Sequence, residues 1–241
     1  MDDKLAANLD SAVELWKQFW GDELESIHLY GSLARGDWSK GSDINLVMFV
    51  KNNDYSRWSE AAGIIRRKMK KGFGIPLMMT RRYLESSLDV YPIEFLDMKL
   101  FHKTLYGDDP FESLNVELRH LRLQAEREIK GKWVAMRQAA LELSGNTSGT
   151  RDLLARSVPT WNAVFQALLV IDGQEVPADK QQVMQAGCKL VGLDASVFEE
   201  LLMVRNESKN INRNAASSLL TRALEQVDKL AIYADKLSVN E

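Results

Sequence analysis

The sequence predicts an α/β (α+β) domain followed by an all-α helical bundle. Up to about residue 112, short apolar stretches of strand length alternate with amphipathic stretches of helical length, whereas from residue 113 onward only long helical patterns remain. A chain of 241 residues also exceeds one typical domain of roughly 100 to 200 residues. We therefore expect two domains, 1–112 and 113–241.

The first domain is expected to open with a helix and to continue with strands. Leu5, Leu9, Val13 and Trp16 recur at helical spacing, and the apolar residues between 24 and 29 then lead into a strand. The stretch "SDINLVMFVK" has the β-branched and apolar character of a second strand, and residues 57–72 have helical composition. Two further strands are expected within residues 75–80 and 104–107.

The second domain is expected to consist of helices alone. Apolar residues from Leu118 to Leu143 recur three or four positions apart, which predicts one long helix. Breaks at 144–150, 172–179 and 192–196 have the length that joins antiparallel helices. The pattern predicts a bundle of four or five helices.

Composition and charge exclude several classes of protein. An apolar fraction of 45% and a charged fraction of 27% are typical of ordinary globular proteins. A net charge of −3 argues against a dedicated duplex-DNA binder, because phosphate binding depends on a positive surface potential, and a nucleic-acid partner is not expected. The lone Cys188 can form no internal disulfide, which fits a reducing compartment. The acidic first residues differ from a signal peptide, and no apolar run approaches the ~20 residues of a membrane span. We expect a cytoplasmic protein with no membrane partner.

The chemistry of the chain is concentrated in "LYGSLARGDWSKGSDINLVMFV", residues 29–50. Gly31 and Ser32 directly follow an apolar strand, where an unobstructed backbone and a hydroxyl bind phosphate oxygens well. Asp43 and Asn45 are two apart, so both side chains are expected on one face of a strand. Two carboxylates on such a face hold Mg²⁺ against a triphosphate, but here only one of the two residues is a carboxylate.

The segment "GSLARGDWSKGSDIN" resembles the signature of the polymerase β nucleotidyltransferase superfamily, in particular its small bacterial members and the antibiotic nucleotidyltransferases. That signature is Gly-Ser, a short spacer, and then Asp-x-Asp or Asp-x-Glu on a strand. The resemblance implies a nucleotidyltransferase fold with a mixed sheet, a nucleoside triphosphate with Mg²⁺, and transfer of a nucleoside monophosphate to an acceptor hydroxyl. It assigns nucleotide binding to Gly31, Ser32, Arg35 and Ser42, and the metal to Asp43 and Asn45. Arg35 and Lys40 could equally serve only to keep the loop solvated.

The sequence departs from this signature at two acids. Asn45 replaces the second carboxylate, so one negative charge is missing from a site whose affinity for Mg²⁺ depends on charge. The third acid of the family lies on the strand after the first helix, and residues 75–77 contain none. Glu94 or Asp97 would replace the third acid if their segment folded against Asp43. Otherwise they form the solvent-exposed face of a short helix.

Two functions stay open at this point. In the first, Asp43, Asn45 and a carboxylate such as Glu94 form the catalytic set of a nucleotidyltransferase. In the second, the site is catalytically degenerate, and the protein acts by nucleotide or protein binding, as a regulatory or toxin-antitoxin-like module. The acceptor in the first case is a small molecule or a protein.

The helical second half is similar to the bundle that several antibiotic nucleotidyltransferases place beside their catalytic domain. This likeness implies an acceptor- or partner-binding role, and it leaves a homodimer open. Glu126 or Glu128 could then act as acceptor base, or could pair on the surface with Arg122. "RNESKN", residues 205–210, resembles the RNxxxH motif of HEPN-type ribonucleases, but Asn210 replaces the final histidine and leaves that chemistry without an evident base.

The three histidines, His28, His102 and His120, are far apart in the sequence. No pair among them has metal-ligand spacing, so the sequence predicts no zinc site.

Overall fold

The computed structural model describes residues 3–38, 42–69, 72–143, 145–206 and 211–238. The chain forms two compact units. Unit 1 comprises Met1–Leu88 and Phe95–Asn115, and unit 2 comprises Asp89–Glu94 and Val116–Glu241. The chain thus enters the helical unit three residues after the expected boundary at residue 112, and the short segment from Asp89 to Glu94 groups with that unit as well.

Unit 1 is built on a mixed sheet of four strands in the order β3-β2-β1-β4. The strands are β1 (Leu24–Tyr30), β2 (Asn45–Val50), β3 (Leu77–Met79) and β4 (His102–Gly107). β1 pairs antiparallel with both β2 and β4, whereas β2 pairs parallel with β3. The four strands lie where the sequence predicts them, and β4 begins two residues before the predicted segment.

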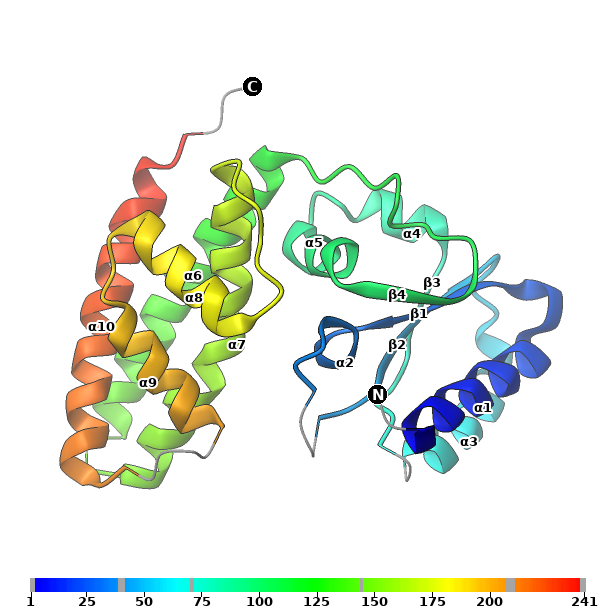
Figure 1. The fold of residues 1–241 in the computed structure, drawn as a ribbon, viewed down its shortest axis with the longest axis horizontal. Coiled ribbons are helices and arrows are strands. Elements are labelled where there is room, and N and C mark those ends of the chain that lie inside the picture. The colour runs from blue at the N-terminus through cyan, green and yellow to red at the C-terminus, as the bar shows by residue number, and fades with distance from the viewer. Residues whose placement is uncertain (1–2, 39–41, 70–71, 144, 207–210, 239–241) are drawn as a thin grey trace. The chain divides into compact units, whose positions relative to one another are not determined.

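Helices lie on both sides of this sheet (Figure 1). α1 (Asp3–Trp20) and α3 (Trp58–Met69) lie on one side, and α4 (Arg81–Ser86) and α5 (Pro92–Leu100) lie on the other. The short elements η1 (Gly21–Glu23), α2 (Ser32–Arg35) and η2 (Tyr55–Arg57) complete the unit within the described residues.

The strand β2 is apolar along its length because both of its faces are buried. Leu46, Met48 and Val50 belong to the core formed with α1 and α3. On the opposite face, the ring of Phe49 packs edge-on against Phe111, with centroids 5.7 Å apart. A strand covered on both sides reads as a continuous hydrophobic run, which explains the pattern of the sequence here.

Unit 2 contains five helices within the described residues, in agreement with the predicted bundle. They are α6 (Leu118–Glu142), α7 (Thr147–Ile171), α8 (Lys180–Val191), α9 (Ala195–Arg205) and α10 (Arg213–Lys236). The last four each begin after an Asn or Asp whose side chain accepts a backbone N–H of the first turn: Asn146, Asp179, Asp194 and Asn212. Such caps satisfy donors that the helix leaves unpaired. Across the described ranges, no helix is both long and apolar enough to cross a membrane.

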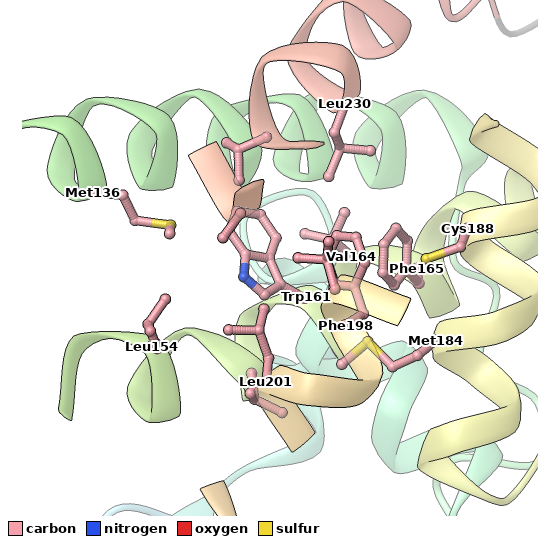
Figure 2. Close-up of a cluster of buried hydrophobic side chains, with 14 of the residues drawn as sticks. Met136, Leu154, Trp161, Val164, Phe165, Met184, Cys188, Phe198, Leu201 and Leu230 are labelled. Carbon is pink, nitrogen blue, oxygen red and sulfur yellow. The ribbon is translucent and has the colours of Figure 1, made fainter. Parts of the chain in front are cut away.

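The core of unit 2 surrounds α7 (Figure 2). Trp161 and Phe165 of this helix are fully buried, and Phe198 of α9 packs edge-on against Phe165 with centroids 5.1 Å apart. Gly187 of α8 lies so close to Phe165 that a Cβ at this position would meet the ring at 2.4 Å. The neighbouring Cys188 is buried, and burial raises the pKa of its thiol to about 12. This cysteine is therefore a packing residue rather than a nucleophile.

Candidate functional site

The turn after β1 depends on a glycine. Gly31 has φ 76° and ψ −151°, a conformation that essentially only glycine adopts, and α2 begins at the next residue, Ser32. Gly36 then ends α2 in the left-handed conformation, with φ 90°. The chain therefore turns sharply at the end of the central strand and leaves Ser32 at the end of the sheet.

Asp43 and Asn45 lie on the neighbouring segment, beside this turn. Asn45 is the first residue of β2 and pairs with Tyr30, the residue before Gly31. A Cβ at Gly74 would lie 2.9 Å from Oδ1 of Asn45 and 3.5 Å from Cβ of Asp43, so the two side chains share one face, as their spacing predicts. Asp43 is exposed.

Two glycines make room for the Asn45 side chain. Its Oδ1 lies beside Gly74, and its Nδ2 would meet a Cβ on Gly31 at 3.2 Å. The amide thus fills the space between the Gly31 turn and the segment before β3. A side chain at Gly31 or Gly74 would displace the amide of Asn45, the residue that replaces the second acid of the superfamily signature.

The third strand offers apolar side chains on this face. Val47 of β2 pairs with Leu77, so Leu77 lies on the face of Asn45, which is two residues before Val47. Leu77 is 39% exposed, and Ile75, two residues before it, is 69% exposed. In this chain, the segment at which the superfamily carries its third acid therefore has apolar side chains, and Leu77 among them lies on the face of Asn45.

Arg35 is buried in an ion pair that the sequence did not predict. Its guanidinium Nη2 lies 2.5 Å from Oδ1 of Asp97 in α5, and the Arg35 side chain is only 5% exposed. The guanidinium also lies over the ring of Phe101, 4.6 Å from its centroid. This contact fixes α2 against α5. A direct role for Arg35 at a phosphate stays a prediction.

Ser42 contributes its backbone to the loop that leads to Asp43. Its carbonyl accepts a hydrogen bond of 3.0 Å from Nε1 of Trp38, a residue that is 40% exposed. The intervening residues 39–41, Lys40 among them, lie outside the described residues. A role for Ser42 in nucleotide binding stays a prediction.

Glu94 groups with unit 2, where its carboxylate accepts a hydrogen bond of 2.7 Å from Nε2 of Gln124 in α6. Its proposed role as a third acid therefore stays a prediction. Glu126 pairs with Arg122 at 3.0 Å and with Lys130 at 2.6 Å, the surface arrangement that the sequence offered as an alternative to a catalytic role. Asn210, which replaces the histidine of the HEPN-type motif, lies outside the described residues.

Unit 2 also contains a polar cavity. It has a volume of about 210 Å³ and lies where α6 ends and α7 and α10 begin. Hydroxyl and guanidinium groups line it, from Thr147, Thr150, Ser217 and Arg213. A lining of this kind suits a polar ligand.

Comparisons with known proteins support a nucleotidyltransferase fold. Residues 9–105 match the family described as the nucleotidyltransferase domain. A candidate protein adenylyltransferase from Methanocaldococcus jannaschii is 45% identical over 53 residues, which are 22% of this chain and 36% of that protein. The match thus spans about a third of the relative's length.

A solved structure has the same fold over both units. Spectinomycin adenyltransferase AAD(9) from Enterococcus faecialis, solved with ATP and spectinomycin, superposes with a TM-score of 0.58. The alignment covers 92% of this chain and 99% of that chain at 11% identity. At such low identity, the likeness concerns the fold.

Proposed function

We propose that this protein transfers a nucleoside monophosphate from a nucleoside triphosphate to an acceptor hydroxyl, because residues 9–105 match the family described as the nucleotidyltransferase domain. The observation that supports the proposal most is the adjacency of the Gly31 turn to Asp43 and Asn45, at one end of β1 and β2. A backbone without side-chain obstruction and an exposed carboxylate are the two features that a triphosphate and its cation need.

Each residue of the site has a proposed role. Gly31 lets the triphosphate approach the backbone, and the hydroxyl of Ser32 donates to a terminal phosphate oxygen. The pair formed by Arg35 and Asp97 holds the turn in place. The acceptor hydroxyl gives up its proton to water as its oxygen forms a bond to the α-phosphorus, and the bond to the leaving pyrophosphate breaks. Catalysis therefore depends on positioning and charge stabilisation.

The residues present fit a single Mg²⁺. This ion is commonly held by one or two carboxylates together with substrate phosphates. Asp43 is an exposed carboxylate, and Asn45 adds an amide oxygen on the same face. When bound, the ion would neutralise charge on the phosphates.

ATP is the donor that we favour, because both similar proteins are described as transferring adenylyl groups. Their names point to two classes of acceptor, a protein and an antibiotic. In the proposal, unit 2 contributes to acceptor or partner binding, for which the cavity beside Arg213 offers polar groups.

A second candidate function is nucleotide binding without transfer. It is favoured by the amide at Asn45 and by the apolar Ile75 and Leu77, since a phosphoryl-transfer site with fewer carboxylates holds its metal less tightly. In this case the protein would act as a regulatory module.

A transfer assay tests the proposal. ATP, GTP, CTP and UTP labelled at the α-phosphate are incubated with Mg²⁺, the protein, and either spectinomycin or a cell extract as source of acceptors. Asp43→Asn should abolish labelling of the acceptor. The matched control is Asp22→Asn, which removes an exposed charge in η1, before the opposite end of β1, and should leave labelling unchanged.

Three outcomes are informative. Label transferred by the wild type and the control but not by Asp43→Asn supports the proposed site. Label transferred equally by Asp43→Asn rules out Asp43 as the metal ligand. Nucleotide binding with no transfer to any acceptor favours the second candidate.

A further inference from the structure

Three side chains of metal-ligating types, from two segments that are far apart in the sequence, meet in unit 1. They are His28 in β1, His102 at the start of β4, and Asp109 just after β4. One ligand atom from each lies within 4.8 Å of the other two. The antiparallel pairing of Tyr30 with His102 brings the two histidines to one face of the sheet, and their ring centroids are 5.8 Å apart.

The hydrogen bonds of His102 leave a lone pair facing a carboxylate. Nδ1 lies 2.8 Å from the backbone carbonyl of Met98, which can only accept, so Nδ1 carries a proton. In the neutral ring, Nε2 is then an acceptor, and it lies 2.8 Å from Oδ2 of Asp109. Two acceptor atoms at this distance require a proton between them. A metal ion that replaced this proton would need the nitrogen and the oxygen to move apart slightly, because each lies about 2.0–2.2 Å from a bound Zn²⁺.

Asp109 is oriented for this contact. Its other oxygen, Oδ1, accepts a hydrogen bond of 2.8 Å from the backbone N–H of Phe111. A backbone carbonyl on one ring nitrogen and a carboxylate beside the other are the usual surroundings of a metal-binding histidine.

His28 supplies a second nitrogen from the interior. Its side chain is fully buried, with Nε2 2.8 Å from Oγ of Ser26 and Nδ1 3.0 Å from Oγ1 of Thr104. Both partners are hydroxyls, which can rotate to donate or to accept, so either nitrogen can be released to bind a metal.

We propose that His28, His102 and Asp109 form a binding site for a divalent transition metal of the zinc class. Two imidazole nitrogens with one carboxylate oxygen suit Zn²⁺, whereas Mg²⁺ and Ca²⁺ prefer oxygen ligands alone. Three protein ligands leave a fourth position for water. Such an ion would join β1, β4 and the segment that follows β4, and so would stabilise unit 1 independently of any nucleotide.

The chain offers well-matched variants for the test. In Asp109→Asn, an amide hydrogen can donate to the lone pair of His102 while the remaining oxygen still accepts from Phe111, so the fold is kept and the charged ligand is lost. His120→Asn removes the third histidine of the chain, which lies on α6 of unit 2, outside the cluster. Cys188 is no part of the cluster, because it is buried in the apolar core of unit 2.

The experiment measures metal binding to untagged, chelator-stripped protein in the presence of excess Mg²⁺. We expect the wild type and His120→Asn to bind one Zn²⁺ by calorimetry, to gain visible absorption with Co²⁺, and to melt at a higher temperature with Zn²⁺. Asp109→Asn should bind Zn²⁺ at least tenfold more weakly and show little absorption with Co²⁺.

The proposal is overturned if the wild type binds no Zn²⁺ at micromolar concentration, or if Asp109→Asn binds it as tightly as the wild type. Nitrogen NMR showing His102 protonated on both ring nitrogens in the presence of Zn²⁺ would also overturn it, because a proton would then occupy the position of the metal.

Discussion

Asn45 is the residue at which the structure and the superfamily signature differ most directly. Its amide lies between Gly31 and Gly74, on the same face as Asp43. We predict that Asn45→Asp strengthens Mg²⁺-dependent binding of ATP by on the order of tenfold, because it adds a negative charge beside the proposed cation. Asn53→Asp is the control, since it adds the same charge at an exposed position beyond the other end of β2. Equal affinity in the two variants, measured by calorimetry, would show that charge is not the missing element.

Alanine substitutions at Gly31 and Gly36 separate two effects of an added Cβ: strain in the backbone and steric contact with Asn45. Both have positive φ, but a Cβ meets Nδ2 of Asn45 at 3.2 Å only at Gly31, and meets nothing within 4 Å at Gly36. We predict that Gly31→Ala lowers the free energy of unfolding by about 1–3 kcal/mol and also weakens nucleotide binding. Gly36→Ala should cost stability, by about 1–2 kcal/mol, and leave binding unchanged. Nucleotide binding that survives in Gly31→Ala would show that the turn is not the phosphate site.

His28 should make the stability of unit 1 depend on pH. Burial lowers its pKa from 6.5 to about 4, so the unfolded chain takes up a proton there that the folded chain excludes. The free energy of unfolding should therefore fall as the pH falls from about 6.5 to about 4, by on the order of 3 kcal/mol. Burial acts to raise the pKa of Asp109, but the hydrogen bonds to its carboxylate lower it overall from 3.8, so this group adds to the loss of stability mainly below about pH 4.

Urea unfolding with a chelator present, followed by tryptophan fluorescence, measures this effect. Trp16, Trp20, Trp38 and Trp58 report on unit 1. In His28→Gln the decrease between these pH values should be smaller, because the neutral side chain takes up no proton. An identical decrease in the wild type and the variant would contradict the assignment.

At the scale of elements, the packing of α8 on α7 depends on Gly187. A Cβ there would meet the ring of Phe165 at 2.4 Å, whereas a Cβ on Gly131 in α6 would meet nothing within 4 Å. We predict that Gly187→Ala destabilises unit 2 by about 1–3 kcal/mol, as overpacking does. Gly131→Ala should stabilise it by up to about 1 kcal/mol, because alanine is the better helix former. Circular dichroism during thermal unfolding compares the two variants. An unchanged stability in Gly187→Ala would contradict the prediction, because it would show that α8 can move away from α7 at little cost.

The elements that the sequence predicts are those with a clear period or a clear cap. The long helices of unit 2 follow from apolar residues three or four apart, and their limits follow from the breaks at 144–150 and 172–179, where the structure places the caps Asn146 and Asp179. The helices α2 (Ser32–Arg35) and α4 (Arg81–Ser86) were not predicted, because four to six residues are too few to show a period.

The site was predictable only where its residues are close in the sequence. Gly31, Ser32, Asp43 and Asn45 come from one segment, and the pairing of β1 with β2 keeps them together. The pairing of β1 with β4 brings His28 to His102, and the packing of α5 brings Asp97 to Arg35. These contacts depend on strand order and on helix packing, which no local pattern encodes.

At the scale of the whole molecule, the chain carries two separate cores. Unit 1 presents the Gly31 turn and Asp43 at one end of its sheet, and unit 2 is a five-helix bundle, within the described residues, with a polar cavity of its own. A transferase needs both a nucleotide site and an acceptor site. In our proposal the first lies in unit 1, and unit 2 contributes to the second.

Calorimetric titration of ATP into the full-length protein, with and without Mg²⁺, tests the central claim most directly. We predict Mg²⁺-dependent binding to the wild type and to Asp22→Asn, and its loss in Asp43→Asn with little change in the thermal melt. Absence of binding at millimolar ATP, or equal binding by Asp43→Asn, would contradict the claim that the Gly31 turn and Asp43 form a nucleotide site.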